Sequence, residues 1–417
     1  MKTLFDSAIV NCGELLTLRG GSGGPKTGAD LSEIGLVEQA AVGMIGGNIA
    51  WVGRQVDYRR QLKAKREIDA EGRVIMPGFV DPHTHAVFAG RRDEEWSVRL
   101  SGRPYLDLLK QGGGILRTVA ETRAASPAAL FKQGEATLLK MLVHGTTTVE
   151  IKSGYGLDPK QERKILKIIR KLREETPLDV VATYLGAHAI PEAFQDQPEA
   201  YVDQIIASLP KMKPLADFCD VFCDEGAFSF GQARRILEAA KQAGFGLKLH
   251  AGEFSDQGGL RLAADLAARS ADHLDIVHKR DLPGLVNAGT LGVLLPGVSH
   301  FLGNKKHAPA RQLIGAGVPV ALATDYNPGS CPCLSMQEIV HLAVLNLKMS
   351  AAESISAATI NAAHAIGRGA QLGSIEVGKQ ADLLMLDLKH YQELPYYFGV
   401  NHVTRVIKKG KLSSPKS

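Results

Sequence analysis

Two histidines, His83 and His85, stand one residue apart at the end of an apolar run over residues 74–80. The run has the composition of a buried strand, and in an extended chain residues i and i+2 point to the same side. Both imidazole rings can therefore face one divalent cation. Neutral imidazole suits zinc, iron and similar metals near pH 7. The pair alone is equally consistent with coincidence, so the interpretation depends on the residues that follow.

Short β-branched runs alternate with amphipathic stretches between about residues 75 and 330, which predicts βα units around a parallel sheet. Two stretches, 161–175 and 233–243, carry apolar residues at helical spacing. The predicted strands are 75–83, 146–151, 180–185, 218–222, 246–250, 273–277, 291–295 and 318–323. Eight such strands predict an α/β fold of the closed (β/α)8, TIM-like barrel type, in which catalytic groups lie at the carboxyl ends of the strands.

Polar residues recur where the predicted strands end. They are His83 and His85 after the first strand, Lys152 after the second, His188 after the third, Asp224 and Glu225 after the fourth, His250 and Glu253 after the fifth, His273 at the start of the sixth and Asp325 after the eighth. Because these ends surround a single site in a barrel, we expect the side chains to lie close together. Polar residues scattered at random would not follow the strand ends in this way.

A metal site is predicted from four of these residues. His83, His85, His250 and Asp325 offer three nitrogens and one oxygen, which leaves room for a water molecule. Such an open site is catalytic in type. A divalent cation there would lower the pKa of the water toward about 7 and polarise a carbonyl group, so the expected reaction class is metal-assisted hydrolysis.

Three carboxyl or imidazole groups could move protons at this site. Asp325 could accept the proton of the attacking water, and Glu253 could relay it. His273 could stabilise the oxyanion or hold the nucleophile. The sequence leaves open which of these groups transfers the proton.

The two ends of the chain are expected to form a second unit. Strand-like runs occur at residues 9–18, 41–52, 67–75, 381–387 and 403–412. We expect residues 1–76 and 366–417 to pair into a small composite β domain of sandwich type, with the catalytic barrel at 77–365. The glycine-rich segment 19–28 lacks the Gly-Lys-Ser/Thr order of a phosphate loop, so it is predicted to be a mobile hairpin loop.

Composition excludes several classes of protein. The 417 residues have a formal net charge of +5 from 49 basic and 44 acidic residues, and the basic residues are dispersed, which argues against nucleic-acid binding. No leader segment and no apolar run of membrane-spanning length is evident, so a cytoplasmic protein with no membrane contact is expected. The five cysteines, including Cys331 and Cys333, fit reduced thiols better than a disulfide framework or a metal site.

Two segments, 77–85 and 378–384, resemble the amidohydrolase superfamily, whose barrel is bracketed by a terminal β domain of the expected kind. Further segments resemble the members of that superfamily that act in histidine degradation. These segments are 89–92, 111–115, 150–156, 184–188, 250–253, 271–274 and 323–330. The resemblance covers essentially the whole chain, and the Lys-Ser-Gly-Tyr-Gly and Asn-Pro-Gly-Ser segments are its most specific parts.

The resemblance implies a substrate and a set of contacts. Water would attack the ring carbonyl of 4-imidazolone-5-propanoate and break a carbon–nitrogen bond, which leaves N-formimidoyl-L-glutamate. One zinc or iron ion would bind to His83, His85, His250 and Asp325. The implied substrate contacts are Arg92, Tyr105, Tyr155, His188, Glu253, Asn327, Gly329 and Ser330. A propanoate tail suits a bidentate guanidinium, which favours Arg92, although its neighbour Arg91 is an alternative.

The sequence departs from the superfamily pattern in two places. Members with two metals bridge them through a carboxylated lysine after the fourth strand, but segment 221–226 contains no lysine, so one metal per chain is expected. Cys331 and Cys333 follow Ser330 where smaller or hydroxylic residues are expected, which leaves the details of that loop open.

Two other functions remain possible from the sequence. A deaminase of ring amidines such as guanine or cytosine could use the same metal site, although an anionic substrate argues against it. A barrel that has lost catalysis and serves as a scaffold is the second alternative, but such chains drop metal ligands and this one keeps all four. A homodimer is expected only because it is the default for soluble enzymes.

Overall fold

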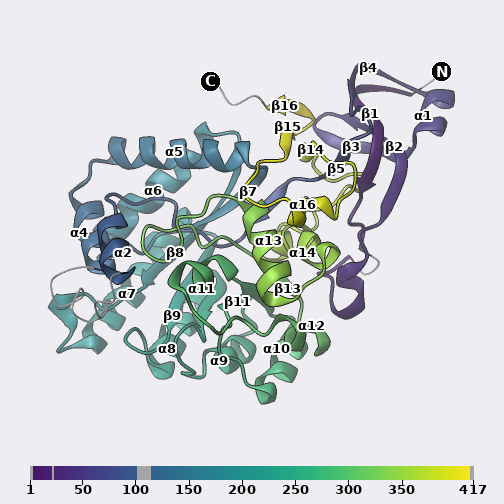
Figure 1. The fold of residues 1–417 in the computed structure, drawn as a ribbon. Coiled ribbons are helices and arrows are strands. Elements are labelled where there is room, and N and C mark those ends of the chain that lie inside the picture. The colour runs from purple at the N-terminus through teal and green to yellow at the C-terminus, as the bar shows by residue number, and fades with distance from the viewer. Residues whose placement is uncertain (1–2, 21–22, 101–113, 414–417) are drawn as a thin grey trace.

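The computed structural model describes residues 3–20, 23–100 and 114–413. Two eight-stranded sheets form within these residues. One is a ring of parallel strands surrounded by helices, and the other is a mixed sheet built from both ends of the chain (Figure 1). The fold is therefore the α/β barrel with a terminal β unit that the sequence predicted.

The parallel sheet follows the order of the chain from its first strand to its last. Its strands are β6 (Phe79–Asp81), β7 (Thr146–Lys152), β8 (Asp179–Ala187), β9 (Phe218–Cys223), β10 (Gly246–Ala251), β11 (Ser270–His273), β12 (Leu291–Leu294) and β13 (Val320–Leu322). An isolated parallel bridge between Thr84 and Tyr326 joins the first and last strands just beyond their ends. The sheet thus closes at the edge where the metal ligands are predicted.

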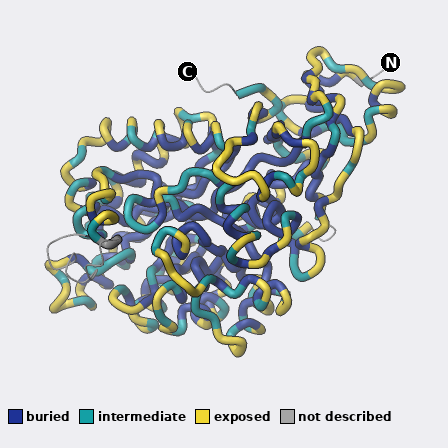
Figure 2. Tube along the Cα trace, in the orientation of Figure 1, coloured by how far each residue is buried: buried dark blue, intermediate teal, exposed yellow. Residues whose placement is uncertain are grey.

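Helices cover the outside of this barrel. They are α2 (Asp93–Leu100), α4 (Ile115–Ala124), α5 (Pro127–Val143), α6 (Pro159–Glu175), α7 (Pro198–Met212), α8 (Phe230–Gln242), α9 (Gly259–Leu266), α10 (Leu282–Ala288), α11 (Pro296–Leu302), α12 (Ala310–Gly315), α13 (Met336–Leu347), α14 (Ala351–Ala357) and α15 (Ile360–Ala365). Every residue of β7 is buried, as expected for a parallel strand covered on both faces (Figure 2).

Helix α6 illustrates how the local sequence determines where a helix begins and which of its faces is buried. Asp158 caps its N-terminus by accepting hydrogen bonds from the backbone N–H groups of Lys160 and Gln161, at 2.9 and 3.1 Å. Pro159 occupies the first turn, where its missing N–H costs nothing. An apolar stripe that includes Ile165 and Ile169 is buried against the barrel, as the helical spacing predicted.

The second sheet takes strands from both termini. They are β1 (Thr3–Leu16), β2 (Leu36–Ile45), β3 (Asn48–Arg54), β4 (Leu62–Asp69), β5 (Val74–Pro77), β14 (Leu383–Leu386), β15 (Val403–Lys408) and β16 (Lys411–Ser413). Two short helices, α1 (Gln55–Gln61) and α16 (Glu393–Tyr396), accompany them. Strand β5 pairs with β1 on one side and with β14 on the other, so the N-terminal and C-terminal segments form one sheet.

Several predicted strands were too long. The predicted run 75–83 divides at Gly78 into β5 of the terminal sheet and β6 of the barrel, and a Cβ on Gly78 would lie 2.2 Å from the Thr147 hydroxyl. The runs 41–52, 67–75 and 403–412 are each two strands, because residues with positive φ such as Gly47, Gly72 and Gly410 turn the chain.

The predicted sixth strand, 273–277, was wrong. The strand that forms is β11 (Ser270–His273), so His273 ends it instead of opening it. His273 and Leu274 have φ values of 82° and 62°, which an extended strand cannot contain. This correction brings His273 into line with the other polar residues, at the carboxyl end of its strand.

The terminal sheet is joined to the barrel by buried charge. Lys408 of β15 lies 2.7 Å from Asp179 at the start of β8 and 2.6 Å from Asp382. Gln380 donates to the same oxygens of both carboxylates, each at 2.6 Å.

None of the described helices combines the length and apolarity that crossing a membrane requires.

Candidate metal centre and substrate pocket

Three histidines and one aspartate meet at the carboxyl end of the barrel, although they come from strands far apart in the chain. His83 and His85 follow β6, His250 lies in β10, and Asp325 follows β13. The backbone fixes their relative height, because the N–H of Asp325 donates to the carbonyl of His83 at 3.0 Å and that of His85 donates to the carbonyl of Tyr326 at 2.9 Å. All four side chains are almost fully buried.

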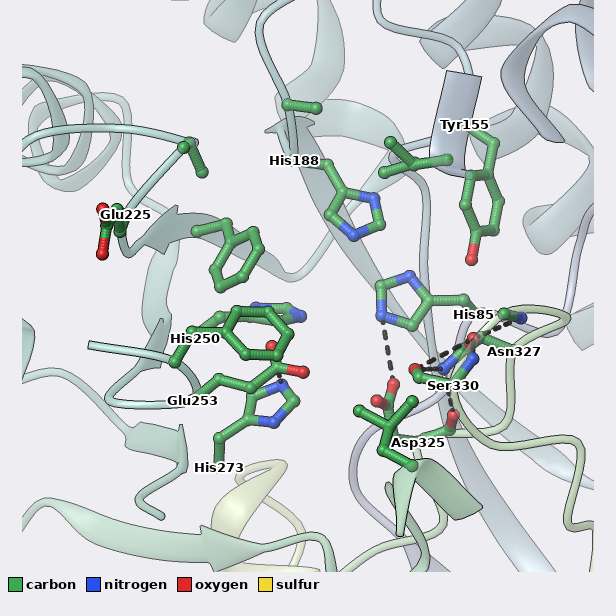
Figure 3. A pocket seen from close by; sticks show the side chains of 18 of the residues that line it. His85, Tyr155, His188, Glu225, His250, Glu253, His273, Asp325, Asn327 and Ser330 are labelled. Carbon is green, nitrogen blue, oxygen red and sulfur yellow. Dashed lines mark hydrogen bonds and ion pairs between the residues drawn. The ribbon is translucent and has the colours of Figure 1, made fainter. Parts of the chain in front are cut away.

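The distances suit a shared cation. The Nε2 atoms of His83 and His85 each lie 3.4 Å from Oδ1 of Asp325, and the rings of His83 and His250 are 4.5 Å apart (Figure 3 shows His85, His250 and Asp325). His83, His85 and Asp325 each offer one ligand atom within 4.8 Å of the other two. His250 forms a second such group with His83 and His273, and a third with His85 and His188.

Buried polar atoms of these side chains that lack a hydrogen-bond partner among the described residues fit a metal ion. Nε2 of His83, Nε2 of His250 and Oδ1 of Asp325 are buried and have no hydrogen-bond partner among the described residues. A buried polar atom without a partner is costly unless it binds something. Burial also lowers the pKa of His83 and His85 well below the usual range, first through loss of hydration, so both rings are neutral and can donate a lone pair.

Two carboxylates orient the rings of His83 and His250 through the ring nitrogens, Nδ1, that are not available to the cation. Nδ1 of His83 donates to Asp272 at 2.7 Å, and Nδ1 of His250 donates to Asp220 at 3.1 Å. Each contact fixes the tautomer that leaves Nε2 free, which is the usual outer arrangement around a metal-binding histidine. The sequence analysis missed both aspartates. The available signal was an acidic residue at an inward-facing position of a strand that is otherwise buried.

Glu253 and His273 lie together on one side of the centre. Their nearest atoms, Oε2 of Glu253 and Nε2 of His273, are 3.5 Å apart. Burial, followed by the charges of Asp325, Asp275 and Asp224, raises the pKa of Glu253 well above its usual range. Burial likewise lowers the pKa of His273. Burial thus disfavours the charged form of both groups. Burial raises the pKa of Asp325 to about 7.

A pocket of about 410 Å³ opens above these groups. His188 stacks on His85 with ring centres 4.9 Å apart, and Tyr155 lies 5.5 Å from the His188 ring. Phe222 and Phe254 line the pocket near His250. The walls are therefore flat aromatic and imidazole rings, which suit a planar ring ligand.

Among the described residues that line the same pocket, one is an arginine. Arg92 lines it, whereas Arg91 is exposed and paired with Asp93. Nε of Arg92 donates to Glu95 at 3.0 Å, and a Cβ on Gly329 would lie 2.1 Å from Nη1 of Arg92. The guanidinium thus packs directly on the glycine, and its two terminal nitrogens make no hydrogen bond to the described residues. Of the two adjacent arginines, Arg92 is thus the one that lines the pocket.

The loop after β13 is organised by Asn327. Its Oδ1 accepts hydrogen bonds from the backbone N–H groups of Gly329 and Ser330, both at 2.8 Å, and its Nδ2 donates to the carbonyl of Asp325 at 2.7 Å (Figure 3 labels Asn327, Ser330 and Asp325). Asn327 therefore shapes the loop that carries Ser330. Cys331 is buried immediately behind it, and all five cysteines of the chain are free thiols.

The structure brings most of the predicted site together. The pocket is lined by His85, Arg92, Tyr155, His188, His250, Glu253, His273, Asp325, Asn327, Gly329 and Ser330. His83 lies beneath it as part of the histidine cluster. Tyr105 lies outside the described residues. Besides Asp220 and Asp272, the sequence analysis missed Glu95, which is buried and whose only local sign was its place three residues after Arg92.

Known proteins resemble this chain over nearly its whole length. The model of the amidohydrolase family matches residues 74–413. The imidazolonepropionase of Bacillus velezensis is 45% identical over 413 residues, covering 99% of this chain and 97% of that protein. The imidazolonepropionase of Caldanaerobacter subterraneus is 47% identical over 406 residues, covering 97% and 96% respectively.

Solved structures share the fold at low sequence identity. An adenosine deaminase from Xanthomonas campestris with bound zinc superposes with a TM-score of 0.72 at 20% identity, covering 99% of this chain and 93% of that chain. The guanine deaminase of E. coli gives a TM-score of 0.71 at 16% identity, covering 98% and 99%. These likenesses establish the barrel architecture. By its family match and its relatives, the chain belongs to the metal-dependent amidohydrolase family and, within it, to the imidazolonepropionases, which are hydrolases of carbon–nitrogen bonds.

Proposed function

We propose that this protein hydrolyses the ring of 4-imidazolone-5-propanoate to N-formimidoyl-L-glutamate with one zinc or iron ion held by His83, His85, His250 and Asp325. The observation that carries the proposal is the set of buried, unpartnered ligand atoms at the floor of a pocket that also contains an arginine. Neutral rings and one carboxylate form the donor set of an open catalytic metal site.

The substrate fits the chemistry of the pocket from both ends. Its propanoate tail would pair with the terminal nitrogens of Arg92, which Glu95 holds in place from the other edge. Its flat ring would lie between the rings of Tyr155 and His188 and the loop that carries Ser330. The same contacts would not favour an uncharged nucleobase, since the terminal nitrogens of Arg92 would then have no carboxylate of the ligand to bind, and only the Nε–Glu95 contact would remain.

The reaction follows from the protonation states of the site. His83, His85, His250 and Asp325 would hold a cation that would supply Lewis acidity to the attacking water and to the ring carbonyl. Asp325 accepts a proton from the water as the water oxygen bonds to the carbonyl carbon. His273 then donates a hydrogen bond to the developing oxyanion. The carbon–nitrogen bond breaks, the carbonyl carbon becomes a carboxyl group, and the leaving nitrogen takes back the proton, with Glu253 beside His273 as the relay.

A direct assay tests this proposal. The absorbance of 4-imidazolone-5-propanoate should fall on addition of protein, the activity should be lost after chelation, and added zinc or iron should restore it. Arg92→Ala should chiefly raise KM, because losing a buried charged pair costs about 2–5 kcal/mol. An unchanged KM would contradict the tail contact. Release of ammonia from guanine or cytosine, without turnover of the imidazolone, would support the deaminase alternative instead.

The proposal extends to the setting of the enzyme. We expect a homodimer in the cytoplasm that acts on a small anionic substrate without nucleic acid or membrane. Light scattering of the purified protein would measure the number of chains. Metal analysis showing almost no bound metal after gentle purification would favour the scaffold alternative.

A further inference from the structure

A buried charge network lies beneath the metal centre, and the reaction described above does not use it. Lys152, at the end of β7, is fully buried, and so are Glu150, Asp220 and Asp272 around it. Nζ of Lys152 donates to Asp220 at 2.8 Å and to Glu150 at 3.0 Å, and it lies 3.6 Å from Asp272. One lysine thus contacts three carboxylates in the interior of the barrel.

Each of these carboxylates also contacts a part of the proposed metal site, and Asp272 does so with Oδ2, the oxygen that faces Lys152. Asp220 uses Oδ2 for Lys152 and Oδ1 for the ring and backbone N–H of His250, at 3.1 and 3.2 Å. Asp272 accepts from Nδ1 of His83 at 2.7 Å and from the hydroxyl of Ser270 at 2.5 Å.

Glu150 extends the same network to the strand that carries the first two ligands. Its Oε2 accepts from the backbone N–H of Thr84 at 3.3 Å, and its carbonyl accepts from the Thr84 hydroxyl at 2.7 Å. Thr84 stands between His83 and His85 in the chain. The N–H of Lys152 also donates to the carbonyl of Thr84 at 2.8 Å. The lysine is therefore one residue removed from every predicted histidine ligand.

We propose that Lys152 is a positioning residue for the metal centre, whose positive charge and hydrogen bonds hold Asp220, Asp272 and Glu150 in the orientation that aims the histidine Nε2 atoms at one point. The inference rests on the proposed metal-dependent function. Without a cation at position 152, Asp220 and Glu150 would lose the lysine that they contact, and Asp272 would keep only the more distant Lys248, at 3.8 Å. At least one of these buried carboxylates would then turn away or take up a proton. The histidine that it holds would then lose its fixed tautomer.

Lys248 in β10 is a matched control for this role. It is equally buried, so its replacement removes the same charge from the same interior. Its Nζ lies 3.8 Å from Asp272 and donates to the carbonyl of Ala365 at 3.4 Å. No contact joins Lys248 to Asp220 or Glu150 within the described part of the chain. Loss of a buried charge is common to both lysines, but only Lys152 connects the carboxylates to one another.

The test measures the dissociation constant of zinc by competition with a chelator, using full-length protein. Lys152→Met should weaken zinc binding about 10- to 100-fold, the range known for residues that orient metal ligands, and Lys248→Met should weaken it less than about threefold. The cobalt(II)-loaded Lys152→Met protein should also show altered absorption bands, because the geometry of the ligands changes. Equal losses in the two lysine variants, or no loss in Lys152→Met, would overturn the proposal.

A double-mutant cycle separates positioning from a general loss of stability. If Lys152 acts through Asp220, the loss of zinc affinity caused by Lys152→Met should be much smaller in an Asp220→Asn background than in the wild type. Additive losses would overturn the role. Should Lys152→Met fail to fold, Lys152→Gln replaces it in the same cycle. Should neither fold, Asp220→Asn and Asp272→Asn decide the question, because a shared lysine requires their effects on zinc affinity to be coupled.

The wild-type protein distinguishes this inference from the proposed function. If wild-type protein binds no zinc or iron, the proposed function itself fails. If it binds zinc and Lys152→Met binds it equally well, only the role of Lys152 fails.

Discussion

Glu95 occupies one edge of the Arg92 guanidinium, with Oε2 of Glu95 at 3.0 Å from Nε of Arg92, and both side chains are largely shielded from water. The same Oε2 also accepts from the backbone N–H of Gly114 at 3.1 Å. The hydrogen bond from Gly114 therefore holds the Glu95 carboxylate in place independently of Arg92. Within the part of the chain that the structure describes, the terminal nitrogens of Arg92 have no hydrogen-bond partner, and Nη1 lies against Gly329.

Glu95→Gln should raise KM about tenfold and leave kcat nearly unchanged, because a hydrogen bond between charged groups contributes about 1.5–3 kcal/mol and Arg92 would lose its fixed position. Steady-state kinetics with 4-imidazolone-5-propanoate measure both constants. Glu94→Gln is the control, since Glu94 is exposed and lies 3.8 Å from Arg117. A fall in kcat with constant KM would show that Glu95 acts elsewhere.

Gly329→Ala should also raise KM, by about tenfold, without loss of folding. A Cβ at this position would lie 2.1 Å from Nη1 of Arg92, so the flexible guanidinium must move away from its place in the pocket. Gly315→Ala is the matched control, because a Cβ on Gly315 meets no atom within 4 Å. Thermal unfolding of both variants should match the wild type. If Gly329→Ala bound substrate normally, Arg92 would not need this position.

Asp325→Asn should lower kcat at least about a hundredfold, because the amide can neither accept the proton of the water nor contribute a negative charge to the metal site. Turnover at saturating substrate and metal content per chain are the two measurements. Asp387→Asn serves as the control, since Asp387 is exposed and pairs with Arg73 in the terminal sheet. Near-normal turnover in Asp325→Asn would refute its assignment as the proton acceptor.

Asp179→Asn should lower the free energy of unfolding by about 1–2 kcal/mol at pH 7, because it removes the charge of one of the two carboxylates that Lys408 contacts, the one that belongs to the barrel. Burial alone would raise the pKa of Asp179, but the charge of Lys408 and hydrogen bonds from Lys408, Lys409 and Gln380 lower it to about 2. The folded pKa is thus below the unfolded one, near 3.8.

The sign of the pH dependence follows from that difference. The stabilisation by Asp179 is fully present above the unfolded pKa and is lost as the pH falls from about 4 to about 2. The free energies of unfolding of wild type and Asp179→Asn should be measured by urea unfolding between pH 7 and pH 3. Their difference should be constant above about pH 5 and should begin to decrease below about pH 4. If the difference in free energy of unfolding increased as the pH fell, the lowered pKa of Asp179 in the folded protein would be contradicted.

The meeting of His83, His85, His250 and Asp325 at one end of the barrel could be predicted from the sequence because each lies at the end of a strand whose apolar run is local. His83 and His85 share one side of an extended segment, and His250 and Asp325 end two other apolar runs. The pattern of apolar residues failed to predict where strands end at positions where single residues change the direction of the backbone. His273 and Leu274 ended the sixth strand earlier than expected, and Gly78 divided one predicted strand between two sheets.

The sequence by itself determined the barrel, the union of the two termini in one β unit and the residue types of the site, since these depend on local patterns of apolar, turn-forming and metal-binding residues. That this unit is a single sheet instead of the expected sandwich emerged only from the structure. Only the tertiary structure decided which groups orient those residues. Asp272 meets His83 across 189 positions of the chain, and Lys152 meets Asp220 across 68. Such contacts depend on the closing of the barrel, which brings the inward faces of distant strands together, and no local pattern encodes them.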